Sequence, residues 1–393
     1  MRTSCASRDC RTWPSPASKG AAEMLRESIQ GKFHVGCFFP NGKTGAVFSD
    51  YLLEVNPEPN AQSLLGLARS CESIGLDWVL IADGWVGLDR LSESLQHASP
   101  MLHAPTLGAV LLAGTERIGV VTTMHTDIHK PAHVARIGAS LDAIGGGRWG
   151  WNIVTDQPNQ APLFGQTPLP HDDRYEIAQE FTDHVKELWH NEEPIDVRGE
   201  YYTVRGRLKT PHIVQRPHPL LVNAAASPAG MRFAARHCDV LMTSAPTVEH
   251  AAQVRATMDE LLVEAGREPH ELDVVVTGKC LVRPTQAEAE DEWARIVDRL
   301  NIDVALDQLG TMYSGDAAMP AREADRELLE AARRVGEGAW FNDMVGSPET
   351  VAERLIALRE VGIAGIAMQF LRWSDSDVRQ LAPALEIFRR ESA

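Results

Sequence analysis

The sequence contains no run of apolar residues long enough to cross a bilayer, and it has no excess of positive charge. Its 54 aspartates and glutamates outnumber its 38 lysines and arginines, so the formal net charge is −16. Binding to nucleic acid requires clustered positive charge, and this balance argues against it. The chain is also 44% hydrophobic over 393 residues, which is enough to bury a large core. We therefore expect a soluble protein with neither a membrane nor a nucleic acid as its partner.

The cysteines lack the pairing that marks a disulfide framework or a zinc site. Six are scattered along the chain and none forms a C-x-x-C pair: Cys5, Cys10, Cys37, Cys71, Cys238 and Cys280. This usage predicts free thiols in a reducing cytoplasm. Residues 1–31 also lack the apolar stretch of about 7–15 residues that a secretory signal needs. We interpret them as a disordered extension of a cytoplasmic protein.

Strand-like and helix-like segments alternate from Phe33 onward, in a pattern typical of a parallel α/β sheet. Eight short β-branched or apolar runs are expected to be strands: 34–39, 77–82, 118–124, 151–154, 220–224, 239–242, 274–282 and 363–369. Amphipathic helices are expected between them, with a closing helix over 376–389. Eight such units predict a TIM (β/α)8 barrel, formed as a single domain by residues 32–393.

Two segments interrupt the alternation. Residues 196–205 are expected to form a small hairpin. Residues 284–346 are charged and helical, and they precede the eighth strand. An insertion at this point of a barrel lies at the rim, so we predict that it acts as a lid.

The segment from His125 to Thr155 carries the strongest local signal. A helix is expected to start at Pro131, where a missing N–H costs nothing, and to stop at the glycines 145–147. Strands flank it on both sides, and a strand–helix–strand unit places its two strands in parallel. The polar residues Thr123 and Asn152 are therefore predicted to lie side by side at one rim.

A second polar group precedes and follows the fifth strand. Arg174 and Tyr175 lie one turn inside a predicted helix, and Ser227 precedes Pro228 at the start of another. Free N–H groups and a hydroxyl at a helix N-terminus can bind phosphate. A phosphorylated cofactor held by Arg174, Tyr175 and Ser227 is one interpretation, and simple capping by Ser227 is the other.

His125, His129 and His133 have the spacing of one helix face, which would suit a metal. Pro131 and the strand end before His125 interrupt that helix, so no metal site is predicted. His125 remains a candidate for contact with substrate or cofactor.

Several motifs together resemble the bacterial luciferase-like superfamily of flavin-dependent monooxygenases. They are Gly146-Gly147-Arg148, Asn152-Ile153-Val154-Thr155, Asp173-Arg174-Tyr175 with Phe181, and Ala225-Ala226-Ser227. The resemblance runs from about Phe33 to Phe388. It is strongest to the branch that contains alkanesulfonate, nitrilotriacetate and pyrimidine monooxygenases.

The resemblance implies a barrel that binds reduced FMN at its C-terminal rim and uses O2 to oxygenate a small molecule. A separate NAD(P)H-dependent flavin reductase would supply the FMN. Asp83 and Gly84 would lie beside the isoalloxazine ring, and Thr123 and Asn152 would flank its edge and the dioxygen pocket, with His125 as a further catalytic candidate. Arg174, Tyr175 and Ser227 would hold the phosphate. The family also implies a homodimer or homotetramer.

The chain departs from the alkanesulfonate enzymes on the seventh strand, where Thr277 and Lys279 replace an arginine and a histidine. A loop of residues 84–87 replaces the thiol-bearing loop after the second strand. The expected pocket is formed instead by Phe39, Trp85, His125, Trp151 and Phe370. It favours an uncharged heterocyclic or aromatic substrate.

Two other functions fit the same barrel. One is a hydride-transfer oxidoreductase that uses the deazaflavin F420 and no O2. The other is a flavin-binding protein without catalysis. Polar Thr123 and Asn152 at the ring edge favour the monooxygenase over the first, and the full set of rim residues favours it over the second.

Overall fold

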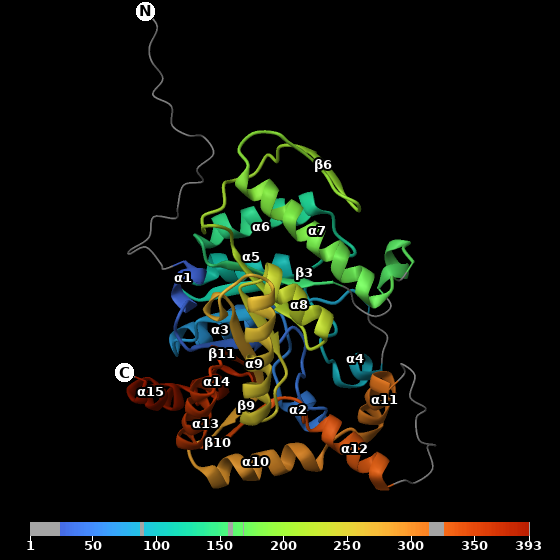
Figure 1. Ribbon diagram of the computed structural model, residues 1–393. Helices are drawn as coiled ribbons and strands as arrows, with labels where there is room; N and C mark the ends of the chain where they lie inside the picture. The colour runs from blue at the N-terminus through green and yellow to red at the C-terminus, as the bar shows by residue number, and fades with distance from the viewer. Residues whose placement is uncertain (1–23, 87–89, 156–159, 168, 314–325, 393) are drawn as a thin grey trace, which may run out of the picture.

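A computed structural model describes residues 24–86, 90–155, 160–167, 169–313 and 326–392. Its parallel strands lie at the centre of the molecule (Figure 1). They close into a barrel in the order β1, β2, β3, β4, β7, β8, β9 and β11, with β11 paired to β1. The bounds are β1 His34–Phe39, β2 Trp78–Ile81, β3 Gly119–His125, β4 Trp149–Val154, β7 Leu220–Ala224, β8 Val240–Thr243, β9 Asp273–Val282 and β11 Gly365–Phe370. The predicted TIM barrel is confirmed, and each barrel strand overlaps its predicted range.

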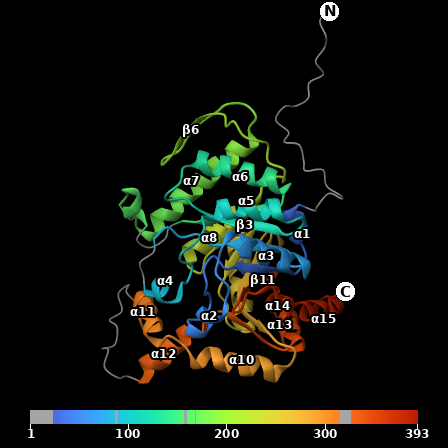
Figure 2. The same ribbon diagram turned by 180° about the vertical axis from the view of Figure 1, so that it is seen from behind.

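The outer helices surround this barrel, as the front and back views show (Figures 1 and 2). They are α3 Ala61–Ser73, α5 Ala104–Gly114, α6 Pro131–Gly145, α7 His171–His190, α8 Pro228–His237, α9 Val248–Glu264, α13 Pro348–Glu360, α14 Asp375–Arg379 and α15 Ala382–Glu391. As predicted, α6 begins at Pro131 and ends before Gly146, whose φ of 60° is left-handed. The closing helix is two helices rather than one, because Pro383 cannot donate the N–H that would continue α14.

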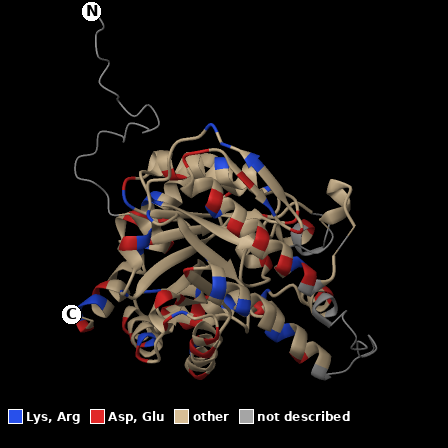
Figure 3. Cartoon of the chain, turned by 45° about the horizontal axis from the view of Figure 1, so that its top comes forward, with Lys and Arg blue, Asp and Glu red and all other residues tan. Residues whose placement is uncertain are grey.

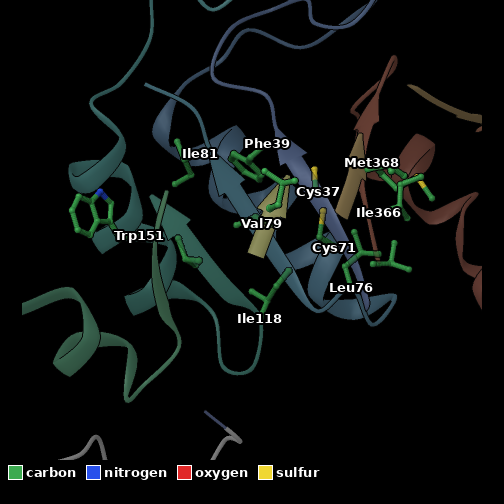
Figure 4. Packing of buried hydrophobic residues seen from close by; sticks show 14 of the residues in the cluster. Cys37, Phe39, Cys71, Leu76, Val79, Ile81, Ile118, Trp151, Ile366 and Met368 are labelled. Atoms are coloured by element: carbon green, nitrogen blue, oxygen red, sulfur yellow. The ribbon is translucent and has the colours of Figure 1, made fainter. Parts of the chain in front are cut away.

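The side chains on the two faces of each strand belong to two different hydrophobic cores, one between barrel and helices and one inside the barrel. Outward side chains pack under the helices, and inward side chains such as Trp78, Val121 and Met242 fill the barrel. Phe39, Trp151 and Phe370 belong to the outward set, and Figure 4 shows the first two of them in that packing. The structure thus corrects the prediction that these three residues line the pocket. The reason is parity: successive side chains of a strand point to opposite faces.

The N-terminal end of the barrel is closed by α1 (Leu25–Ile29). Leu25 and Ile29 are almost fully buried among the inward side chains. Arg26 anchors the helix, because its guanidinium donates to both carboxylate oxygens of Asp239 at 2.7 and 2.5 Å. The predicted disordered extension is therefore too long at its C-terminal end, and its residues 1–23 lie outside the described residues.

The predicted hairpin is confirmed as β5 (Ile195–Arg198) paired with β6 (Thr203–Gly206). The long insertion contains α10 Gln286–Asp298, α11 Ile302–Tyr313, α12 Arg326–Gly336 and β10 Asn342–Gly346. The C-terminal half of β9 pairs with β10, whereas its N-terminal half pairs with β8, so β10 extends the barrel wall above β8. Helix α11 contacts α4 (Arg90–Leu95), and α10 contacts α2 (Asp50–Val55). The insertion thus lies at the C-terminal rim, and its function as a lid stays a prediction.

Lysine, arginine, aspartate and glutamate residues lie mainly on the helices and loops, while the central strands carry few of them (Figure 3). Among the helices that the structure describes, none is both long and apolar enough to cross a membrane.

Candidate active site at the C-terminal rim of the barrel

A cavity of about 540 Å³ opens at the carboxyl ends of the strands. Phe38, Met242, Thr277 and Gln369 project into it from the inward faces of β1, β8, β9 and β11. The rest of its wall comes from the last residues of β7 and β8, from loops and from the insertion: Gly45, Ala46, Phe48, His97, Ala224, Ala225, Ala226, Thr243, Ser244, Gln308, Trp340 and Phe341. Apart from Ala225 and Ala226, which belong to a motif found in the sequence, the loop and insertion residues were not predicted, because no local periodicity marks a side chain that closes a cavity from a loop.

Thr123 and Asn152 lie side by side, as predicted, since the register of β3 and β4 pairs them directly. The Asn152 amide donates to Thr123 Oγ1 at 3.0 Å, and the Thr123 hydroxyl donates to the Ile81 carbonyl at 2.9 Å. Both side chains are buried on the inward face. Asn152 Oδ1 is also buried, and nothing in the described part of the chain donates to it. The pair is a rigid polar unit with one acceptor left to bind a ligand.

His125 follows on the same inward face at the end of β3 and is fully buried. Burial lowers the pKa of His125 to about 4, so the ring is neutral at pH 7. Its Nδ1 lies 3.4 Å from Gln160 Nε2, and Gln160 in turn donates to Asp127 at 2.7 Å. Because β3 ends at His125 and α6 starts at Pro131, the three histidines do not share a helix. The described residues form no cluster able to hold a metal ion.

Asp83 comes directly after β2 and is buried at the start of α5. Its Oδ1 accepts from the Ala104 amide at 3.2 Å, and the Gly84 amide donates to Met101 Sδ at 3.1 Å. Burial raises the pKa of Asp83 to about 7. Trp85 is partly exposed beside this turn, with edge-on ring contacts to His103, His129 and Phe164. Asp83 therefore positions the loop that presents Trp85 at the rim.

The raised pKa of Asp83 predicts that stability falls as the pH rises through the acidic range. Between the ordinary aspartate pKa of about 4 and the folded value of about 7, the folded state holds a proton that the unfolded state has lost. The free energy of unfolding then declines by up to about 4 kcal/mol across this window and is level above it. Asp83→Asn keeps the acceptor for Ala104 and should remove this decline. Urea denaturation at pH 5 and pH 8 tests this, and equal pH dependence in both proteins would contradict it.

Tyr175 and Ser227 meet at the N-terminus of α8. Ser227 Oγ accepts from the Gly230 amide at 3.2 Å. A Cβ placed on Gly230 would lie 2.5 Å from Ala225 Cβ, 2.6 Å from the Tyr175 hydroxyl and 3.2 Å from Ser227 Oγ, so only glycine fits there. Arg174 lies beside Tyr175 on α7 and donates from Nε to the Leu169 carbonyl at 2.8 Å. The two hydroxyls and the helix N-terminus thus form a small polar cradle at the rim.

The model of the family "Luciferase-like monooxygenase" matches residues 33–365. Dibenzothiophene-sulfone monooxygenase of Rhodococcus erythropolis is 27% identical over 385 residues, covering 81% of this chain and 84% of the relative. Nitrilotriacetate monooxygenase component A of Aminobacter aminovorans is 31% identical over 346 residues, covering 73% and 76%. The crystal structure of a long-chain alkane monooxygenase superposes with a TM-score of 0.81 at 22% identity over 92% of both chains, a likeness in fold.

Proposed function

Because the chain belongs to the luciferase-like monooxygenase family, as its motifs predicted, we propose that it is a two-component FMN-dependent monooxygenase. A separate NAD(P)H-dependent flavin reductase supplies the reduced FMN. One atom of O2 enters a small substrate and the other leaves as water while the flavin is oxidised. The observation that carries the proposal is the buried Thr123–Asn152 pair near the C-terminal ends of β3 and β4, whose acceptor Asn152 Oδ1 receives no hydrogen bond from the described residues.

The residues present fit FMN on two counts. Asn152 Oδ1 is a buried acceptor that needs a donor, and the edge of a flavin ring offers one. The cradle at α8 combines two hydroxyls with a helix N-terminus, a donor set that suits a phosphate. Thr123, Asn152, Asp83 and Gly84 would then hold the ring, and Arg174, Tyr175 and Ser227 the phosphate end.

When bound, reduced FMN supplies the two electrons that the reaction with O2 consumes. The chain contributes orientation and a dry, polar environment. The Thr123 hydroxyl and the Asn152 amide are dipoles fixed by their mutual hydrogen bond, so they cost no reorganisation as charge develops. Neutral His125 adds a polar group without adding a charge.

The substrate that fits this cavity is uncharged and heterocyclic or aromatic. None of the cavity residues that the structure describes is an aspartate, glutamate, lysine or arginine. Lys279 lies on the same face of β9 as Thr277. Its Nζ donates to the Glu337 carbonyl at 3.1 Å and lies 4.6 Å from the centre of the Trp293 ring. It is therefore held by the insertion. An anionic substrate would meet no countercharge, which disfavours an alkanesulfonate.

Stopped-flow spectroscopy tests the proposal. The protein is mixed anaerobically with reduced FMN and then with oxygenated buffer. We expect tight binding of reduced FMN and an absorbing species that outlives the oxidation of free reduced FMN. Immediate return to oxidised FMN, together with tight binding of F420, would instead favour the hydride-transfer alternative. Binding of FMN with no effect on its reaction with O2 would favour the non-catalytic one. Location in the cytoplasm and assembly as a homodimer or homotetramer both stay predictions. Size-exclusion chromatography with light scattering tests the oligomeric state.

A further inference from the structure

Two buried polar side chains line the cavity and are not among the residues that we propose to hold FMN. Thr277 on β9 and Gln369 on β11 lie on adjacent strands, with Thr277 paired to Ala367 and Gln369 two residues nearer the rim. They are only 6% and 8% exposed. Neither Thr277 Oγ1 nor Gln369 Oε1 has a hydrogen-bond partner within the described ranges. Burying such atoms unpaired costs about 1–3 kcal/mol each, so the arrangement is suited to a ligand that pairs with them.

The orientation of Gln369 is set by its neighbour Gly45. A Cβ on Gly45 would lie 2.6 Å from Gln369 Nε2 and 3.1 Å from its Cδ, so the amide nitrogen packs against the Gly45 backbone. The carbonyl oxygen of Gln369 is then the amide atom that is buried beside the cavity without a hydrogen bond from the described residues. Thr277 offers a hydroxyl that can donate. The pair thus presents one donor and one acceptor on neighbouring strands.

The rest of the cavity is apolar or neutral. Phe38 and Met242 line it from the barrel, and Trp340 and Phe341 from the insertion. Flat aromatic walls fit a planar ring. The ring must satisfy a donor and an acceptor together and carry no charge.

We propose that Thr277 and Gln369 are the substrate-recognition pair of this enzyme, and that they bind a neutral lactam or cyclic imide. The Thr277 hydroxyl donates to the ring carbonyl, and Gln369 Oε1 accepts from the adjacent ring N–H. This assignment rests on the proposed function, since it takes the cavity as the substrate side of the flavin site. It makes these two residues determinants of specificity, because a polar site discriminates strongly against a ligand that cannot pair with it.

Calorimetric titration, under anaerobic conditions, of the protein loaded with reduced FMN tests this with matched probes. The probes are quinolin-2-one, its N-methyl derivative, benzothiophene sulfone and quinoline-2-carboxylate. We expect quinolin-2-one to bind at least about tenfold more tightly than the N-methyl derivative, equivalent to one lost hydrogen bond. The carboxylate should bind weakest. Equal affinity for quinolin-2-one and its N-methyl derivative overturns the proposal, and so does preferential binding of the sulfone.

Substitutions at Thr277 and Gln369 test whether these two residues determine the affinity for quinolin-2-one. Thr277→Val and Gln369→Met should each weaken quinolin-2-one by about tenfold, and Gln369→Met should abolish the preference over the N-methyl derivative. Gly45→Ala should act like Gln369→Met, because it displaces the amide without changing its chemistry. Lys279→Met is the matched control, because Lys279 lies on the same face of β9 as Thr277, and it should leave quinolin-2-one affinity unchanged. Wild-type affinity in both Thr277→Val and Gln369→Met would refute the assignment.

Affinity for reduced FMN is measured first, by anaerobic titration followed by tryptophan fluorescence. Failure of the wild-type protein to bind reduced FMN counts against the proposed function. Normal FMN binding with no binding of quinolin-2-one overturns only the recognition pair. Variants that bind FMN like the wild type are folded, so a loss of quinolin-2-one binding in them is specific.

Discussion

Asn152→Leu is expected to weaken the binding of reduced FMN by about tenfold to a hundredfold. Leucine has nearly the same volume, but it lacks the acceptor Oδ1 and the amide that donates to Thr123. The flavin edge would lose its partner and remain unpaired in a buried site, which costs about 1–3 kcal/mol. Anaerobic titration of the variant with reduced FMN, followed by fluorescence, measures the change.

Successive side chains of β3 point to opposite faces, so this strand offers a test residue, Thr123, beside a control residue, Thr122. Thr123 points inward to Asn152, whereas Thr122 points outward and accepts from the Trp149 indole at 2.9 Å. Thr123→Val should weaken flavin binding in the same direction as Asn152→Leu, because it leaves the Asn152 amide without its acceptor. Thr122→Val should lower stability and leave flavin affinity unchanged. If Asn152→Leu and Thr123→Val both bound reduced FMN as tightly as the wild type, the ring site would have to lie elsewhere.

The barrel could be predicted from the sequence because each strand is a compact apolar run that ends at polar or turn-forming residues. The same property explains the largest error. A strand buried on both faces carries no polar alternation, so its pattern does not say which residues point inward. Phe38 and Phe39 are equally apolar, yet Phe38 lines the cavity and Phe39 lies under the helices. Trp151 and Phe370 were misplaced for the same reason.

Polar residues were placed better than apolar ones. A threonine or an asparagine near the end of a buried strand must find a hydrogen-bond partner, which limits where its side chain can lie. Thr123 and Asn152 are directly paired in the register of β3 and β4. Tyr175 and Ser227 meet because α7 and α8 pack against each other. The contribution of Trp340 and Phe341 to the cavity depends on how the insertion folds back over the rim, which is a long-range contact with no local pattern.

Helix α1 was missed because its signal is short. Two buried apolar residues in a five-residue segment form too short a hydrophobic pattern to predict a helix. An isolated helix of this length is also unstable in water. It forms because Leu25 and Ile29 fill the end of the barrel, so tertiary packing decides the local structure.

Arg148→Met is expected to lower the free energy of unfolding by about 3–5 kcal/mol. The side chain is buried, and its guanidinium donates to the Ile118 and Leu112 carbonyls at 2.8 Å each and to Thr115 at 3.1 and 3.2 Å. Methionine fills the volume but leaves these acceptors unpaired at the junction of α5, β3 and β4. Arg148→Lys keeps the charge with fewer donors and should lose less. Urea denaturation at pH 7 measures the change, and a loss below about 1 kcal/mol in Arg148→Met would mean that water replaces the guanidinium, as at an exposed site. In the luciferase-like motif Gly146-Gly147-Arg148, the arginine therefore maintains the strands that carry Thr123 and Asn152, from their N-terminal ends and thus from the opposite end of the barrel to the proposed flavin site.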